Sequence, residues 1–173
     1  QQRSSPKQGG VIFSQGVICA SIYVTHIFRN CLICGNTGKS TAGVVSGSGA
    51  SNYFKFESCT VTGNRTETGT VGGINIAGCG TTANTWVKNC VVWGNEGPEG
   101  AVQLNADATK VSYSCYPEAD PTNANGNTPD DPKLRTVKRY RGYPSPAGSC
   151  YEAGNATGWT VDDVDLSGAP RLR

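Results

Sequence analysis

The chain has 173 residues, enough for one domain with a hydrophobic core of its own. Its net charge of +2 is too small to favour nucleic acid or an anionic membrane surface as a partner. No apolar run approaches the roughly 20 residues that a membrane span needs. Glycine occurs 23 times and only 16% of the residues are charged, while Asn, Thr and Ser separate short runs of Val, Ile and Phe. This composition predicts many short strands joined by turns.

Residues 1–9 are polar, and we interpret them as an arm that precedes the repeats. The chain begins with glutamine and not with methionine, which suggests a processed form or a fragment of a longer protein. The repeats that predict the fold begin after the arm.

A short phrase recurs after the arm: a small polar residue, a cysteine, an apolar residue two positions later, and Gly-Asn. The cysteines of this phrase lie 28, 31 and 25 residues apart, at Cys31, Cys59, Cys90 and, in a half copy, Cys115. A second phrase, in which glycine precedes apolar residues, keeps the same period at 10–12, 43–45, 73–75 and 100–102. Such a period is typical of stacked repeats.

One copy of the repeat cannot bury its apolar face alone, because its strands are too short. If each copy is one turn of a coil, equivalent residues stack about 4.8 Å apart and pair as parallel strands. We therefore predict an all-β fold, a right-handed parallel β-helix (solenoid) of about four coils over residues 10–117. Residues 118–173 are predicted to form a loop and a C-terminal cap over the last coil. Neither a leucine-rich repeat nor an antiparallel sandwich explains the recurring corner residues.

The repeat predicts two inner ladders. One contains the leading cysteines, Cys31, Cys59, Cys90 and Cys115, and the other contains Asn36, Asn64 and Asn95 at a corner. Asparagine suits a corner because it tolerates left-handed backbone angles and can bond to the same amide one coil away. Strand alternation also places the residues three before and two after each cysteine in the core, and the residue directly after it outside.

The remaining cysteines bear on crosslinks and metals. We expect a disulfide between Cys115 and Cys150, because it would clamp the cap to the last coil. Eight cysteines suggest an oxidising compartment, although repeat cysteines can equally be small buried hydrophobic residues. The single C-x-x-C pair, Cys31 and Cys34, has its members on opposite faces of a strand, which argues against zinc. The only histidine, His26, is interpreted as structural.

The later part of the chain carries three specific stretches, Asn-Thr-Pro-Asp-Asp-Pro-Lys-Leu at 127–134, Ser-Pro-Ala-Gly-Ser-Cys-Tyr-Glu-Ala-Gly at 145–154 and Asp-Leu-Ser-Gly-Ala-Pro-Arg-Leu at 165–172. With the repeat, they make residues 10–173 resemble secreted right-handed β-helix proteins of Bacteroidetes-type bacteria, which have a pectate-lyase-like repeat and a similar tail. Those proteins normally have more coils and continue into an Asp-Ile-Gly strand. The resemblance implies export, an extracellular or cell-surface location, and adhesion or polysaccharide contact, but no particular enzyme.

Polysaccharide lyases and galacturonases share this fold, so an enzymatic function is an alternative for this chain. A lyase would require carboxylates on adjacent coils to hold calcium, and no acidic residue recurs in one column. Glu57 aligns with Arg29 and Lys88, an alternation of sign that indicates charge pairing on an outer face. Glu96 and Glu99 are close enough in sequence for a glycosidase pair but flank a proline in an exposed turn. We therefore do not expect an enzyme.

A calcium site is a weak candidate in the last part of the chain. Asp163, Asp165 and Ser167 place oxygens on alternate residues before a glycine, as in the first half of a calcium loop. The later acidic ligand of such a loop is missing, and the resemblance accounts for the same residues as a tail turn. No other cofactor is expected.

Tyr53, Trp86 and Trp93 are candidates for an aromatic strip on one outer face, which could stack on the sugar rings of a polysaccharide or host glycan. Scattered exposed aromatic residues are also common without any role. Both interpretations stay open at this point.

The prediction of function is a secreted or cell-surface structural or adhesive β-helix protein. Because the polar arm is unsuited to cover the apolar end of a coil stack, we expect self-association through the β-helix ends, head to tail, into extracellular filaments. The alternatives are a carbohydrate-binding module and a polysaccharide lyase or hydrolase fragment.

Overall fold

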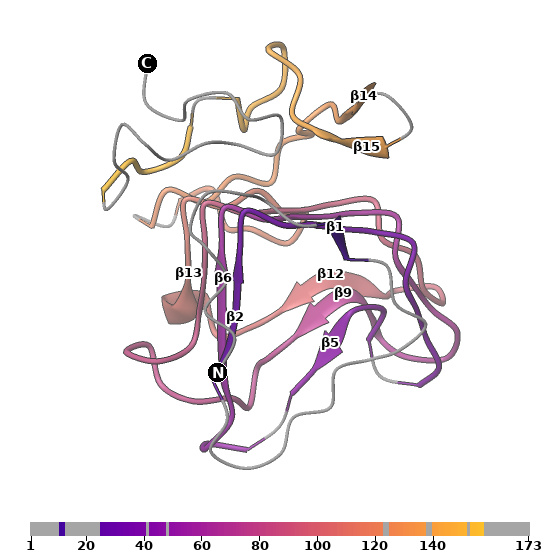
Figure 1. Ribbon diagram of the computed structural model, residues 1–173, viewed down its shortest axis with the longest axis vertical. Coiled ribbons are helices and arrows are strands. Elements are labelled where there is room, and N and C mark those ends of the chain that lie inside the picture. The colour runs from indigo at the N-terminus through magenta and orange to yellow at the C-terminus, as the bar shows by residue number, and fades with distance from the viewer. Residues whose placement is uncertain are drawn as a thin grey trace.

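A computed structural model of the protein describes residues 11–12, 25–40, 42–47, 49–122, 125–137, 140–151 and 153–157. The protein is nearly all β, with 2% helix, and its parallel sheets stack as a solenoid of about three turns (Figure 1). The predicted parallel β-helix is confirmed, although it has about one turn fewer than expected. The arm at residues 1–9 lies outside the described residues. Among the helices of the described residues, none is long and apolar enough to cross a membrane.

Three parallel sheets form the sides of the coil. The first sheet contains β2 (Thr25–Arg29), β6 (Tyr53–Glu57), β10 (Trp86–Lys88) and β13 (Val111–Ser112). The second contains β1 (Val11–Ile12), β3 (Leu32–Ile33), β7 (Thr60–Val61) and β11 (Val91–Val92). The third contains β5 (Val45–Ser46), β9 (Val71–Asn75) and β12 (Val102–Asn105).

Shorter elements complete the structure. They are the parallel corner pair β4 (Thr37–Gly38) and β8 (Arg65–Thr66), the antiparallel pair β14 (Arg135–Val137) and β15 (Tyr140–Tyr143), and the 3-10 helix η1 (Ala108–Lys110). A fourth turn begins with β13, and Cys115 still pairs with Val91 beside the second sheet. The half copy of the repeat at Cys115 lacks Gly-Asn, so the next corner does not form and the turn stays incomplete.

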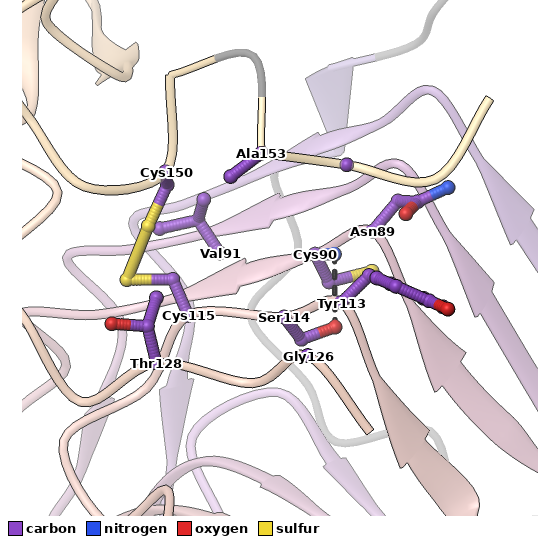
Figure 2. A pocket seen from close by; sticks show the side chains of 11 residues that line it. Asn89, Cys90, Val91, Tyr113, Ser114, Cys115, Gly126, Thr128, Cys150 and Ala153 are labelled. Carbon is purple, nitrogen blue, oxygen red and sulfur yellow. Dashed lines mark hydrogen bonds between the residues drawn. A yellow bond between two sulfur atoms is a disulfide. The ribbon is translucent and has the colours of Figure 1, made fainter. Parts of the chain in front are cut away.

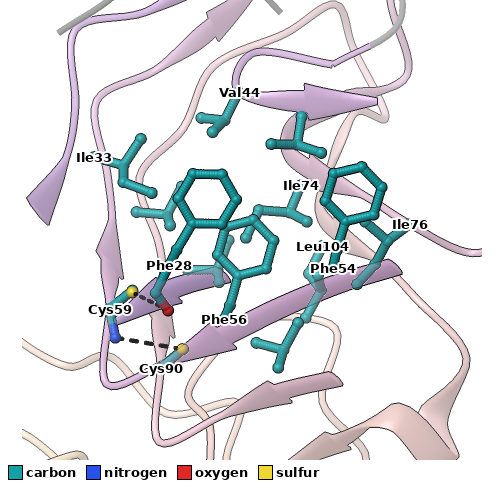
Figure 3. Packing of buried hydrophobic residues seen from close by; sticks show 14 of the residues in the cluster. Phe28, Ile33, Val44, Phe54, Phe56, Cys59, Ile74, Ile76, Cys90 and Leu104 are labelled. Atoms are coloured by element: carbon teal, nitrogen blue, oxygen red, sulfur yellow. Dashed lines mark hydrogen bonds between the residues drawn. The ribbon is translucent and has the colours of Figure 1, made fainter. Parts of the chain in front are cut away.

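The core lies between the three sheets (Figure 3). In-register pairing of β2 with β6 stacks Phe28 on Phe56, with ring centroids 4.6 Å apart and an angle of 8° between the rings. His26 stacks on Phe54 in the same way, at 5.0 Å and 15°, which gives it a packing contact. The predicted core columns around Phe28 and Ile33 are confirmed, since Phe56, Val87, Val61 and Val92 are also buried.

The register of the second phrase was predicted wrongly. Val11 and Ile12 pair with Leu32 and Ile33, so this first copy belongs to the second sheet and not to the third. Val45 pairs with Ile74, one residue out of step with the expected alignment of 43–45 with 73–75. A glycine followed by apolar residues fits any short strand that begins after a bend. This second phrase therefore does not determine which residues of neighbouring turns pair.

The residues directly after the ladder cysteines were expected to face outwards; they lie outside the main core, but they are buried. Leu32, Thr60 and Val91 are 2%, 8% and 7% exposed. Val91 packs against Leu134, and β15 contacts β7, so the C-terminal part of the chain covers the outer face of the second sheet. Strand alternation gives the direction of a side chain but not what lies beyond it.

The C-terminal part of the chain has two roles. Residues 125–128 add one more rung to the stack, because the Thr128 N–H donates to Ser114 O at 3.0 Å and Cys115 pairs with Thr128. Residues 134–137, 140–151 and 153–157, here called the C-terminal segment, lie along the side of the stack next to the second sheet (Figure 1). Among the described residues of the expected cap, those at 125–128 add a rung to the last turn, whereas the C-terminal segment lies beside the stack.

Candidate functional site

Each rung of the cysteine ladder is preceded by a residue with a left-handed backbone conformation. Asn30, Ser58, Asn89 and Tyr113 have φ values of +55°, +53°, +53° and +50°. The residues that follow them occupy equivalent places: Cys31, Cys59, Cys90 and then Ser114. The fourth rung of the ladder is therefore a serine, and the prediction that Cys115 is in the inner ladder was wrong.

Hydrogen bonds confirm the position of Ser114 in the ladder. The Cys59 N–H donates to Cys90 Sγ at 3.4 Å, and the Cys90 N–H donates to Ser114 Oγ at 3.1 Å. The Ser114 N–H in turn donates to Asn127 Oδ1 at 3.0 Å, in the rung at 125–128. Cys115 instead matches Val91, since its N–H donates to Cys90 O at 2.8 Å.

The slip is one of sequence and not of strand pairing: the cysteine of the fourth copy stands one residue later than in the other copies, while residues 111–115 pair with the preceding turn at a constant offset. Val111 pairs with Val87. Val111 lies four residues before Cys115, whereas Val87 lies three residues before Cys90. Ser112 and Pro117, which alternation placed in the core, are half-buried and exposed. Val111 and Tyr116 take the core positions instead, at 1% and 8% exposure.

Because of this slip, Cys115 faces the C-terminal segment and forms a disulfide with Cys150 (Figure 2). The two residues are 35 apart in sequence and their Cα atoms are 6.2 Å apart, within the usual range for disulfides. The predicted disulfide is confirmed, but it attaches the segment to the side of the stack. Val91, Leu134 and Trp93 pack around it as an apolar cluster separate from the main core.

A second clamp lies one turn away from the disulfide. Asn89 Nδ2 donates to Asn155 O at 2.8 Å, and the Asn155 N–H donates to Asn89 Oδ1 at 2.8 Å. Between the two clamps is a cavity of about 50 Å³, lined among others by Asn89, Tyr113, Cys115 and Cys150 (Figure 2). Sequence reasoning missed both asparagines, although Asn89 stands at the small polar position of the repeat.

The thiols of the ladder, at Cys31, Cys59 and Cys90, are buried in the stack. Cys59 Sγ lies 3.4 Å from Phe28 O and 3.3 Å from Glu57 O, and Cys31 Sγ donates to Arg29 O at 3.3 Å. Burial raises the pKa of the Cys59 thiol, so the nucleophilic thiolate is disfavoured. Within the described ranges, no three His, Cys, Asp or Glu residues lie together in a way that could hold a metal ion.

The asparagine ladder is confirmed. Asn36 Nδ2 donates to Asn64 Oδ1, and Asn64 Nδ2 donates to Asn95 Oδ1, both at 2.8 Å. All three residues are at most 7% exposed. Gln103 closes the ladder, because its Oε1 accepts from Asn95 Nδ2 at 3.0 Å and its Nε2 donates to Asn95 O at 2.9 Å. No pattern in the sequence identified Gln103, which belongs to the third sheet and not to the repeat phrase.

The predicted aromatic strip is only partly brought together. Tyr53 and Trp86 both belong to the first sheet and are half-buried, whereas Trp93 follows β11 and packs in the cluster around the disulfide. Lys55 Nζ and Lys88 Nζ lie 4.3 and 4.8 Å from the centroid of the Trp86 ring. The indole of Trp86 is therefore flanked by cations and does not present two free faces.

Charge pairing on the first sheet follows the predicted alternation. Arg29 pairs with Glu57, with 2.7 Å between Nε and Oε2.

Asp107 accepts hydrogen bonds from the Thr109 N–H and hydroxyl, which lower the pKa of its carboxyl, and it caps η1. The weak calcium candidate at Asp163, Asp165 and Ser167 lies outside the described residues.

Comparison of the chain with models of known families, with curated proteins and with solved structures found no match.

Proposed function

We propose that the protein is a secreted or cell-surface structural or adhesive β-helix module. The proposal rests on the role that the recurring polar residues of the repeat have in the structure. Cysteine and asparagine, which in other proteins often serve chemistry, here form internal ladders that join one turn to the next. A chain whose repeated side chains serve the stack is suited to provide a stiff scaffold with large flat outer faces.

Head-to-tail association of copies is the assembly that this scaffold favours. The outermost strands of the first sheet are β2 and β13. Among the described residues β2 has no strand on its outer side, whereas at β13 Val111 O accepts from Asn127 Nδ2 and the Tyr113 N–H donates to Asn125 O, both in the rung at 125–128. Because the stack is parallel, the open edge of β2 in one copy is suited to pair with the last rung, at 125–128, of another. Ile27 on β2 is 63% exposed, which places an apolar side chain beside the edge. Such a heterologous contact does not close and produces filaments.

Sedimentation velocity and negative-stain electron microscopy test this proposal. Wild-type protein is expected to form concentration-dependent linear assemblies, and Ile27→Lys should weaken them at least tenfold, because a charge beside an open edge opposes pairing. Thr82→Lys, which adds the same charge in an exposed turn, is the matched control and should assemble like the wild type. Monodisperse wild-type monomers at all concentrations would count against assembly.

A carbohydrate-binding module is the second candidate, favoured by Tyr53 and Trp86 on one sheet face. Aromatic rings on a flat sheet can stack on sugar rings, and the lysines beside Trp86 would add hydrogen-bond donors. A glycan array with wild type and Trp86→Ala tests it, with Trp93→Ala as the control from the other face. Binding that survives Trp86→Ala would exclude this face.

A further inference from the structure

The C-terminal segment is attached to the stack at few points. The disulfide between Cys115 and Cys150 is its covalent link, and the Asn89–Asn155 pair is its best-formed polar contact. Among the described residues, further contacts include the packing of Leu134 on Val91 and of β15 on β7, with the Ser149 hydroxyl bonded to Asp130 O at 3.0 Å.

The two sulfur atoms differ in accessibility. Cys115 is 1% exposed, whereas Cys150 is half-buried and follows the exposed Ser149. The cavity of about 50 Å³ adjoins the disulfide on the side of Asn89 and Tyr113 (Figure 2). An external thiolate can therefore approach Cys150, with Cys115 as the leaving group in the interior.

We propose that the Cys115–Cys150 disulfide is a redox latch, whose reduction by an external dithiol releases the C-terminal segment and exposes the outer face of the second sheet. In the reaction, a thiolate of the dithiol attacks Cys150 Sγ, the bond between the two protein sulfurs breaks, and Cys115 leaves as a thiolate that takes up a proton. The second thiol of the reagent then displaces Cys150 and forms a disulfide within the reagent. Two electrons and two protons pass from the dithiol to the protein.

The latch acts on the segment and not on the stack. A crosslink that closes a loop of 35 residues favours the closed state by several hundred-fold, roughly 4 kcal/mol. The ladders of the stack do not pass through Cys150, and the Cys115 backbone stays bonded to Cys90 O. Reduction therefore opens the segment locally, uncovering Val91 and Thr60, while the three turns persist.

Hydrogen–deuterium exchange tests the latch. The reporter is the Asn155 amide, which is protected only by Asn89 Oδ1 on the stack. Addition of dithiothreitol to wild type is expected to raise exchange at Asn155 at least tenfold and to leave the Thr60 and Val91 amides within twofold. The double variant Cys115→Ser/Cys150→Ser should show the same pattern without reductant. Cys34→Ser removes a free thiol away from the disulfide and should behave like oxidised wild type.

Two results would overturn the latch. Unchanged protection of Asn155 after complete reduction, verified by intact mass, would show that the other contacts suffice to hold the segment. Equal loss of protection at Asn155 and Val91 would show that the disulfide staples the whole fold. Asn89→Gly gives an independent check, since it removes the second clamp and keeps the left-handed backbone. Because the Asn155 amide loses its acceptor in this variant, it should exchange fast even when the disulfide is intact, and reduction should add less than in wild type. An increase on reduction as large as that of wild type would contradict the role given to Asn89.

Discussion

Ser114 occupies in the fourth turn the place that Cys90 holds in the third, and its Oγ accepts the Cys90 N–H at 3.1 Å. The equivalent bond one turn earlier runs from the Cys59 N–H to Cys90 Sγ at 3.4 Å. A serine thus continues a cysteine ladder, and the cysteine after it is turned outwards. This difference of one residue converts a packing residue into a partner for Cys150.

Exchanging the two residues of the last rung tests this register. In Ser114→Cys/Cys115→Ser the cysteine is placed in the ladder, where it faces the core, so we expect the disulfide to Cys150 to be lost. A peptide mass map without reductant should show Cys150 as a free thiol. Cys90→Ser, which changes a ladder cysteine and leaves Cys115 in place, should retain the disulfide. A crosslink between positions 114 and 150 would show that the ladder does not hold the register.

Asn64, the middle residue of the asparagine ladder, is predicted to be the ladder residue whose replacement destabilises the protein most. Asn64 is 0% exposed and bonds to asparagines on both sides, so Asn64→Ala removes the buried side-chain hydrogen bonds to Asn36 and Asn95. We expect a loss of about 2–4 kcal/mol in the free energy of unfolding, measured with urea. Asn105→Ala breaks an exposed bond to Asn75 of the same kind and should cost less than about 1 kcal/mol. Equal effects would mean that burial of the ladder adds nothing.

Stability should fall in mildly alkaline solution because of Cys59. Burial raises the pKa of this thiol above its ordinary value of 9.0, so above about pH 9 the unfolded chain releases a proton that the folded chain retains. The free energy of unfolding then decreases by up to about 1.4 kcal/mol per pH unit from this group. Below pH 9 the contribution is constant.

Urea unfolding of wild type and Cys59→Ser at pH 8 and pH 10 isolates this group. The decrease between the two pH values should be smaller in the variant, because serine does not titrate, while other ionisable groups contribute equally to both proteins. Cys34→Ser, at a half-buried thiol, is the control and should show a smaller difference from wild type. A Cys59→Ser variant with the same pH dependence as wild type would exclude the effect.

The rung at 125–128 depends on Gly126. Its φ is +70°, and a Cβ there would lie 2.7 Å from Cδ1 of the Tyr113 ring. Gly126→Ala is therefore expected to lose about 1–2 kcal/mol from the backbone and at least about 1 kcal/mol more from displacement of the ring. Gly100 has a φ of +80° and open space around it, so Gly100→Ala measures the backbone part alone. Identical thermal unfolding of the two variants would place Tyr113 away from Gly126.

Much of the fold follows from the residues of the repeat. Small polar residue, cysteine, apolar residue, glycine and asparagine recur at a spacing that only stacked turns satisfy, and the asparagine bonds from Asn36 to Asn95 were predicted from that spacing alone. The core columns at Phe56 and Val61 also followed, because alternation along a strand is a local property.

The candidate site was less accessible to such reasoning. Gln103 closes the asparagine ladder from another sheet, and Asn89 clamps Asn155, which is 66 residues away. Neither contact leaves a local pattern. Trp93 looked equivalent to Trp86 in sequence, but the two side chains lie on different sheets, and the C-terminal segment packs around Trp93.

The sequence by itself determined the parallel stack, the asparagine ladder from Asn36 to Asn95 and the pairing of Cys115 with Cys150, because these depend on a repeated period and on the position of the last coil before the tail. Only the tertiary structure decided the direction of Cys115, since the strand pairing places Ser114 opposite Cys90 and Cys115 opposite Val91, on the outer face. It also decided where the C-terminal segment lies. That position depends on which outer face offers apolar surface and a reachable sulfur, and here the face is the second sheet, beside Val91 and Cys115.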